Sequence, residues 1–77
     1  MRDDEMWEKT YGQPLKLGLP VVVNSSYRYY QDYQDSDWYI TGLYFEKDGD
    51  RVNITISELL GYPCSYDGFS ITDLFLK

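Results

Sequence analysis

The side chains of this sequence that could do chemistry are mainly carboxylates. Asp32, Asp35 and Asp37 follow one another closely, and Asp48 and Asp50 form a second pair further along the chain. Grouped carboxylate oxygens suit calcium, but neither group has the spacing of a calcium-binding loop with its glycine and terminal glutamate. We therefore expect no metal and no other cofactor, and we interpret these aspartates as solvated loop and turn residues.

Catalytic groups of the usual kinds are scarce. The chain has no histidine, so the side chain that most often acts as a general base is missing. Its one cysteine, Cys64, lies beside Pro63 with no imidazole to activate it, and we interpret it as an inert thiol. We expect a protein that is not an enzyme.

The best candidate for a functional surface is the segment 27–37, YRYYQDYQDSD, which combines four tyrosines with three aspartates. A loop of this length in so short a chain is more often functional than a short connection is. Its tyrosines could anchor a basic protein while its aspartates steer the encounter. Alternatively, the carboxylates could imitate nucleic-acid phosphates, or the tyrosines could fold back over the core. The candidate binding residues are Tyr29, Tyr30, Asp32, Tyr33, Asp35, Asp37 and Trp38.

Length and charge limit the possible partners. The 77 residues carry a net charge of -6, which disfavours binding to the phosphate backbone of nucleic acid and to anionic membrane surfaces. No apolar run approaches transmembrane length, and the first residues have no signal-peptide pattern. With a single cysteine, these features favour a cytoplasmic protein whose partner is a basic protein.

Two strands joined by a tight turn must position the candidate surface. Val52, Ile54 and Ile56 alternate with polar residues, as in a strand with one buried face. The preceding arm is apolar on both faces, with Trp38, Ile40 and Tyr44 on one and Tyr39, Leu43 and Phe45 on the other. Such an arm is either covered on both sides or leaves one aromatic face for a partner, which could be a second copy in a homo-oligomer. The residues between the arms, 47–50, read KDGD, and Asp-Gly is typical of tight hairpin turns.

The flanking segments complete the sheet. Residues 1–11 are predicted to form a helix that Gly12 ends, or else a disordered leader anchored by Trp7. A first strand is expected over 19–26, extending as far as Tyr29 or Tyr30, and a helical turn over 57–61. Phe69 and Ile71 indicate a short strand, and 73–76 one turn or a last edge strand. The expected buried residues include Val22, Ile40, Ile54, Ile56 and Ile71.

Four stretches carry a resemblance to a known family: GLPVVV at 18–23, WYITGL at 38–43, VNI at 52–54 and FSITDL at 69–74. Their order resembles the plan of SH3-like barrels of the KOW type over residues 18–76. The resemblance implies one domain over 1–77, with a helix or arm at 1–12. We expect a mainly β fold, a small antiparallel SH3-like barrel of four to five strands. A short N-terminal helix precedes it, and one helical turn precedes the last strand.

The resemblance also implies a function. Barrels of this kind are non-catalytic modules that bind protein or nucleic acid, and the chain is similar in character to small accessory proteins of phages and prophages. RNA-binding members would have basic loops, whereas here aspartates occupy the loops. We therefore expect a protein-interaction module that modulates a host protein through its acidic, tyrosine-rich loop; a nucleic-acid-associated barrel and a homo-oligomeric structural component are the alternatives.

Overall fold

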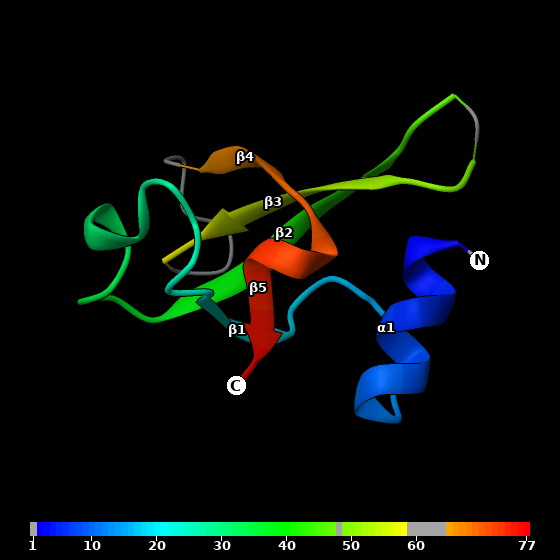
Figure 1. The fold of residues 1–77 in the computed structure, drawn as a ribbon, viewed down its shortest axis with the longest axis horizontal. Helices are drawn as coiled ribbons and strands as arrows, with labels where there is room; N and C mark the ends of the chain where they lie inside the picture. Colours follow the sequence, from blue (N-terminus) through cyan, green and yellow to red (C-terminus); the bar gives the residue numbers. More distant parts are fainter. Residues whose placement is uncertain (1, 48, 59–64) are drawn as a thin grey trace.

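The fold is mainly β, as predicted, with five strands and one short N-terminal helix in the part of the chain that the structure describes (Figure 1). The computed structural model describes residues 2–47, 49–58 and 65–77. The helix and strands are α1 (Asp3–Tyr11), β1 (Pro20–Val23), β2 (Trp38–Phe45), β3 (Val52–Ser57), β4 (Tyr66–Phe69) and β5 (Leu74–Leu76). Two short 3-10 turns are η1 (Tyr30–Asp32) and η2 (Ile71–Asp73).

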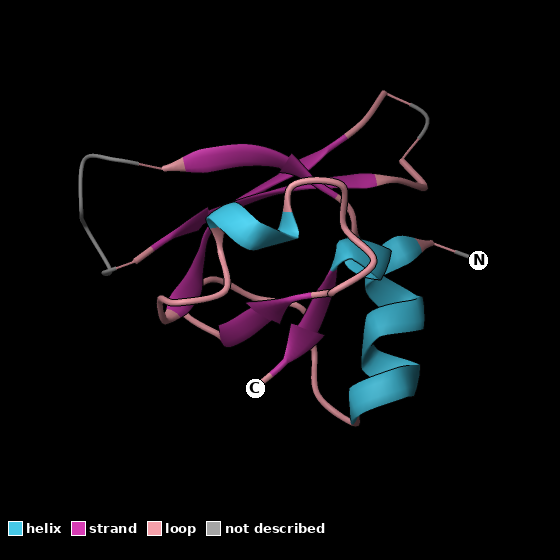
Figure 2. Cartoon of the chain, turned by 60° about the vertical axis from the view of Figure 1, so that its left-hand side comes forward, coloured by secondary structure: helices cyan, strands magenta, loops and turns pink. Residues whose placement is uncertain are grey.

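The five strands form one antiparallel sheet in the order β4-β3-β2-β1-β5. The chain runs from β1 to β4 through neighbouring strands and then crosses through η2, so that β5 pairs with β1. Figure 2 shows how the strands curve around a common interior. The buried apolar side chains form one cluster there, to which α1 contributes Trp7 and every strand contributes at least one residue.

The predicted central hairpin is confirmed as β2 and β3. The amide of Glu46 donates to the carbonyl of Arg51 (2.9 Å), and the amide of Gly49 donates back to the carbonyl of Glu46 (2.8 Å). Gly49 has φ +78°, a left-handed conformation that glycine adopts without steric cost. The sequence signal at this turn therefore has a direct physical basis.

A β-bulge in β2 explains why both faces of this strand looked apolar. Ile40 pairs with Ile56 and Gly42 pairs with Thr55, so Thr41 is an extra residue that switches the later side chains to the opposite face. The prediction that Tyr44 shares a face with Trp38 and Ile40 is wrong, because Tyr44 is 73% exposed. After the bulge it is Leu43, on the same face as its partner Ile54, that packs against the core.

Two contacts hold the bulge. The hydroxyls of Thr41 and Ser57 share a hydrogen bond (2.9 Å), and Ser57 is buried. Gly42 lies so close to β3 that a Cβ at this position would be 2.9 Å from the Cβ of Thr55. Close approach to the neighbouring strand, not backbone freedom, is therefore the reason for glycine here.

The first strand is shorter than expected and shows the other face to the core. β1 ends at Val23, so the expected extension toward Tyr29 or Tyr30 does not occur. Val21 and Val23 are buried, whereas Val22 is 38% exposed, so its predicted burial is wrong. Three consecutive valines contain no alternation from which the inward face could be chosen.

The other expected core residues divide into two groups. Ile40, Ile54 and Ile56 are buried, as predicted. Ile71 is only partly buried against the core, because it begins the η2 turn instead of continuing the preceding strand. The predicted short strand through Phe69 and Ile71 therefore ends at Phe69.

The N-terminal helix is docked on the sheet. Gly12 ends it in a left-handed conformation (φ 73°), with its amide donating to the carbonyl of Glu8 (2.8 Å). At its start, the amide of Asp3 donates to the carbonyl of Asp50 (2.8 Å), and the Asp3 carboxylate accepts from the amide of Val52 (3.1 Å). The helix alternative is thus confirmed, and the disordered leader is not what the structure has.

The end of the chain forms an edge strand, one of the two expected alternatives. β5 follows η2, and η2 is held by a capping box in which Ser70 and Asp73 satisfy one another's backbone amides. The helical turn expected over 57–61 is not confirmed: Ser57 belongs to β3, and 59–61 lie outside the described residues. Among the described residues, no helix is long and apolar enough to cross a membrane.

Candidate binding surface

The segment between β1 and β2 folds over one end of the sheet through its aromatic rings. We call this region the loop end, made of residues 24–37 and the rings beneath them. The ring of Tyr33 lies 5.2 Å from that of Trp38, 5.4 Å from Phe69 and 5.5 Å from Tyr66. Tyr27 packs beside it, 4.9 Å from Phe69. Tyr27 and Tyr33 therefore follow the alternative in which the tyrosines of this segment fold back over the core.

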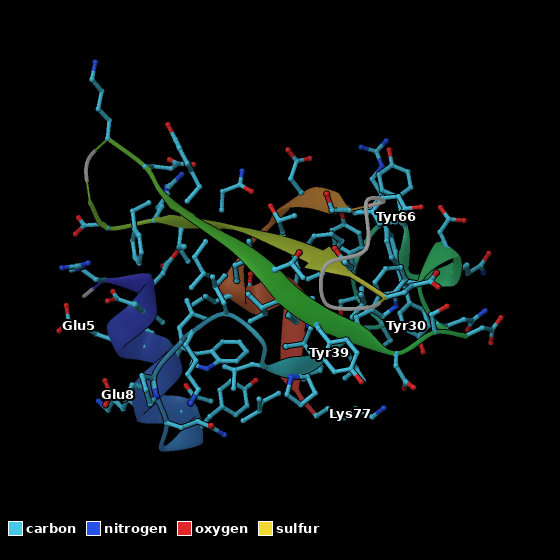
Figure 3. All side chains as sticks on the ribbon, turned by 180° about the vertical axis from the view of Figure 1, so that it is seen from behind. Glu5, Glu8, Tyr30, Tyr39, Tyr66 and Lys77 are labelled. Carbon is cyan, nitrogen blue, oxygen red and sulfur yellow. The ribbon has the colours of Figure 1, made fainter. Side chains whose placement is uncertain are left out.

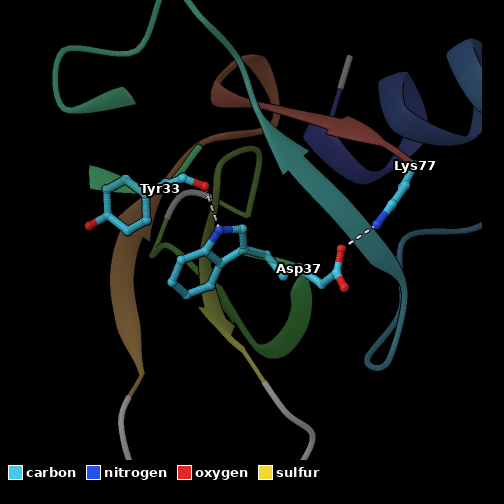
Figure 4. A network of polar contacts seen from close by, with 4 residues as sticks. Tyr33, Asp37 and Lys77 are labelled. Atoms are coloured by element: carbon cyan, nitrogen blue, oxygen red, sulfur yellow. Dashed lines mark hydrogen bonds and ion pairs between the residues drawn. The ribbon is translucent and has the colours of Figure 1, made fainter. Parts of the chain in front are cut away.

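Hydrogen bonds fix the path of this segment although it contains no strand. The indole N–H of Trp38 donates to the carbonyl of Tyr33 at 2.8 Å (Figure 4). Asn24 accepts from the amide of Ser26 (2.9 Å) and donates to the carbonyl of Thr72 (3.0 Å). In the η1 turn, the amide of Tyr33 donates to the carbonyl of Tyr30 (2.9 Å). Hydrogen bonds within the loop end, together with one to Thr72, therefore hold this segment in a defined path.

The predicted binding residues fall into two groups in the structure. Tyr29, Asp32, Asp35 and Asp37 are exposed, so they can reach a partner. Tyr30 and Tyr33 are partly buried and pack against the core, and Trp38 is buried. The structure therefore separates side chains that face solvent from side chains that hold them in place.

Other residues join this surface from distant parts of the sequence. Glu58 follows β3 and accepts a hydrogen bond of 3.4 Å from the hydroxyl of Ser36, while the exposed Tyr66 of β4 lies 5.5 Å from the Tyr33 ring. Figure 3 shows Tyr66 and Tyr30 at the end of the molecule opposite α1, which carries Glu5 and Glu8. No local pattern points to Glu58 or Tyr66, because only the sheet order brings them to the loop.

One aspartate of the loop is paired. The ammonium of Lys77 donates to Asp37 Oδ1, and this hydrogen bond raises the pKa of Lys77 (Figure 4). Both side chains are largely exposed, so the pair contributes little to stability. The only other ion pair within the described residues joins Arg2, just before α1, to Asp4 in its first turn. Asp32 and Asp35 thus present their charge to solvent without a salt bridge to any described residue.

Tyr27 and Tyr33 are neutral at physiological pH. Burial raises the pKa of Tyr27, and the negative charge of Asp73 adds to this effect. Burial likewise raises the pKa of Tyr33, with smaller contributions from Tyr27, Tyr66 and Asp32. These rings therefore act as apolar supports with a hydroxyl tip and not as bases.

A hollow of about 340 Å³ lies against the loop end, lined by Ser25, Tyr27, Arg28, Tyr29, Tyr30, Gln31 and Asp32. The guanidinium of Arg28 lies 5.6 Å from the centre of the Tyr29 ring, a cation–π geometry. No group of three potential metal-ligating side chains occurs among the residues described. The chemistry that this surface offers is therefore hydrogen bonding, aromatic contact and charge.

No family model, no curated protein and no solved structure matches this chain. The likeness to KOW-type barrels accordingly stays a prediction from sequence pattern. Function has to be argued from the surface, because a fold alone does not determine it.

Proposed function

We propose that this chain is a non-catalytic protein-interaction module that binds a basic surface of another protein through its loop end. The observation that carries the proposal is that one segment contains both side chains packed on the core and charged side chains that face solvent. Tyr27 and Tyr33 pack inward on Phe69 and Trp38, and Asp32 and Asp35 of the same segment face solvent.

Such an arrangement suits recognition for an energetic reason. A loop that is already ordered loses less conformational entropy on binding than a disordered one, so more of the contact energy remains as affinity. Exposed carboxylates speed the encounter with a basic partner, and the exposed rings of Tyr29 and Tyr66 provide amphipathic contact area. The net charge of -6 favours the same kind of partner.

We also propose that the fold is a small SH3-like barrel. The order β4-β3-β2-β1-β5, with a 3-10 turn leading into the last strand, supports this assignment. An accessory protein of a phage or prophage that acts on a host protein in the cytoplasm is the biological setting that we propose. The small size and acidic charge of the chain are in keeping with it.

The test is a pull-down from bacterial lysate with the tagged chain, with and without nuclease. The proposal predicts one stoichiometric protein that survives nuclease treatment. Asp32→Asn/Asp35→Asn/Asp37→Asn should reduce its capture by about tenfold or more, since several charged contacts are lost together. The matched control, Glu5→Gln/Glu8→Gln/Glu46→Gln, removes the same charge elsewhere and should retain capture.

Two outcomes would contradict the proposal. Equal loss in both triple variants would mean that net charge matters and the loop end does not. Capture that disappears with nuclease would favour the nucleic-acid alternative, in which the exposed Tyr29 and Tyr66 stack on bases. Light scattering on the purified chain separately tests the homo-oligomeric alternative, since a monomer at high concentration excludes it.

A further inference from the structure

The edge of β5 offers backbone groups for hydrogen bonding. The amide of Asn24 donates to the carbonyl of Asp73 (2.7 Å), and the amide of Lys77 donates to the carbonyl of Pro20 (3.0 Å). Along an antiparallel pair of strands, residues whose backbone groups bond the partner strand alternate with residues whose backbone groups point away from it. Asp73 and Lys77 are bonded residues, so Leu74 and Leu76 direct their N–H and C=O groups away from β1. Within the described part of the chain, β5 pairs with β1 alone.

A groove runs along this edge. In Figures 1 and 2, β5 lies between β1 and α1, so the helix flanks the edge that β1 leaves open. The groove between them has a volume of about 350 Å³ and is lined by Met6, Trp7, Thr10, Tyr11, Asn24, Ile71, Thr72, Leu74 and Phe75. The described residues that line it are mostly apolar and include no charged side chain, and Met6 and Phe75 are exposed at its rim.

Trp7, one of the residues that line the groove, has an unsatisfied donor. Trp7 is 1% exposed, and its indole N–H is buried without a hydrogen-bond partner among the described residues. A buried donor without an acceptor costs about 1–3 kcal/mol, so native structures seldom leave one without a reason. No hydrogen bond from this N–H to a described residue would therefore be lost if the packing around Trp7 opened to admit a partner.

We propose that this groove binds an extended peptide segment of a partner protein, which pairs with β5 as an added strand. The outward backbone groups of Leu74 and Leu76 fit an extended chain, and adding a strand to an open sheet edge is a common mode of peptide recognition. The apolar walls select uncharged side chains at the centre of the segment, since a charge there would be desolvated without a partner. The net charge of -6 selects basic residues on its flanks.

This site shares Asn24 with the loop end but uses none of its exposed tyrosines or aspartates. The probe is therefore a synthetic peptide with no resemblance to the loop, acetyl-KKVTVTVKK-amide, titrated into the full ¹⁵N-labelled chain. We expect the largest chemical-shift changes at the amides of Leu74 and Leu76 and at the Trp7 indole N–H. Hydrogen exchange at Leu76 should slow at least tenfold in the complex, because a paired amide is protected.

Two N-methylated peptides test strand pairing itself. One is methylated at the valine amides and the other at the threonine amides, so each blocks one edge of the added strand. Because only one edge can pair with β5, one peptide should bind about tenfold more weakly and the other should keep its affinity. Equal affinities of the two peptides would overturn the proposal.

Variants of the rim locate the site. Phe75→Lys should weaken binding about tenfold by placing a charge at the groove, whereas Tyr44→Lys, which adds the same charge at an exposed aromatic residue of β2, should not. Circular dichroism would verify that both variants are folded. The proposal is overturned by absent binding at millimolar peptide, by shifts confined to the loop end, or by equal effects of the two substitutions.

Discussion

The two tryptophans are buried to nearly the same extent, yet they hold the two ends of the molecule in different ways. Trp7 is 1% exposed and Trp38 is 2% exposed. The indole N–H of Trp38 donates to the carbonyl of Tyr33, while that of Trp7 has no partner among the described residues. We call the region around α1 and β5 the helix end, in contrast to the loop end.

The comparison shows that apolar packing and hydrogen bonding contribute differently at the two ends of the molecule. At the loop end, aromatic packing and a directed hydrogen bond fix the backbone, and the charged side chains on it can face solvent in a defined arrangement. At the helix end, Trp7 is held mainly by apolar contact, including the Tyr11 ring at 4.5 Å, and a groove remains beside it. The loop end is suited to present charge, and the helix end to accept an apolar chain.

The largest expected effect comes from the core that both ends share. Ile54 is fully buried and pairs with Leu43 and Phe69, so it lies between the two ends. Ile54→Ala should lower the free energy of unfolding by roughly 2–5 kcal/mol. For a domain with only about 5 kcal/mol of stability, both ends should then unfold in one transition. Urea denaturation followed by fluorescence and by circular dichroism would test this, and an effect below 1 kcal/mol would mean that Ile54 is not a core residue.

The β-bulge in β2 is expected to give the next largest effect on stability. Before it, β2 turns Trp38 and Ile40 inward, and after it the strand turns Leu43 toward the core. Gly42→Ala forces a Cβ to within 2.9 Å of Thr55 and should cost about 1–3 kcal/mol through strain. A thermal melt would measure the loss. Gly42→Ala combined with Thr55→Gly should recover part of it, and no recovery would contradict the steric explanation.

A matched pair of substitutions tests whether the hydrogen bond of Trp38 stabilises the fold in a way that Trp7 does not. Both Trp38→Phe and Trp7→Phe lose ring volume, but only the first removes a hydrogen bond and leaves the carbonyl of Tyr33 without its donor. Trp38→Phe should therefore be more destabilising than Trp7→Phe by about 1–2 kcal/mol. Equal losses in urea denaturation would remove the proposed difference between the two ends.

Alkaline pH should weaken the loop end selectively, with a smaller effect. The pKa values of Tyr27 and Tyr33 are raised above the ordinary value of 10.0 in the folded chain, mainly by burial. The unfolded chain therefore releases these protons first, so their stabilising contribution is complete below about pH 10 and is lost as the pH rises through the raised values. Melting temperatures from pH 8 to 11 should fall less steeply in Tyr27→Phe/Tyr33→Phe. An unchanged slope in this variant would argue against the assignment.

Much of the architecture follows from local sequence signals. The alternation of Val52, Ile54 and Ile56, the Asp-Gly turn and the glycine after Tyr11 predict the hairpin and the helix correctly, because each signal acts within a few neighbouring residues. The inward face of Val21–Val23 and the bulge at Thr41 could not be predicted, since contacts with neighbouring strands determine both.

The candidate surface divides in the same way. The exposure of Asp32, Asp35 and Asp37 agrees with a segment of polar composition. The buried supporting position of Trp38 and the arrival of Glu58 and Tyr66 depend on the sheet order, which no local pattern reveals. The groove beside β5 depends on a crossover that returns the last strand to the first, so the sequence gives no sign of it.

The most direct test of the contrast between a fixed loop end and an adaptable helix end is hydrogen exchange of the two indole N–H groups in one ¹⁵N-labelled sample. We predict that the Trp38 indole exchanges only with global unfolding, since it is bonded to Tyr33. The Trp7 indole should exchange at least tenfold faster through local opening of α1, and peptide bound in the groove should slow it. Equal protection of the two indoles, or faster exchange at Trp38, would contradict the account.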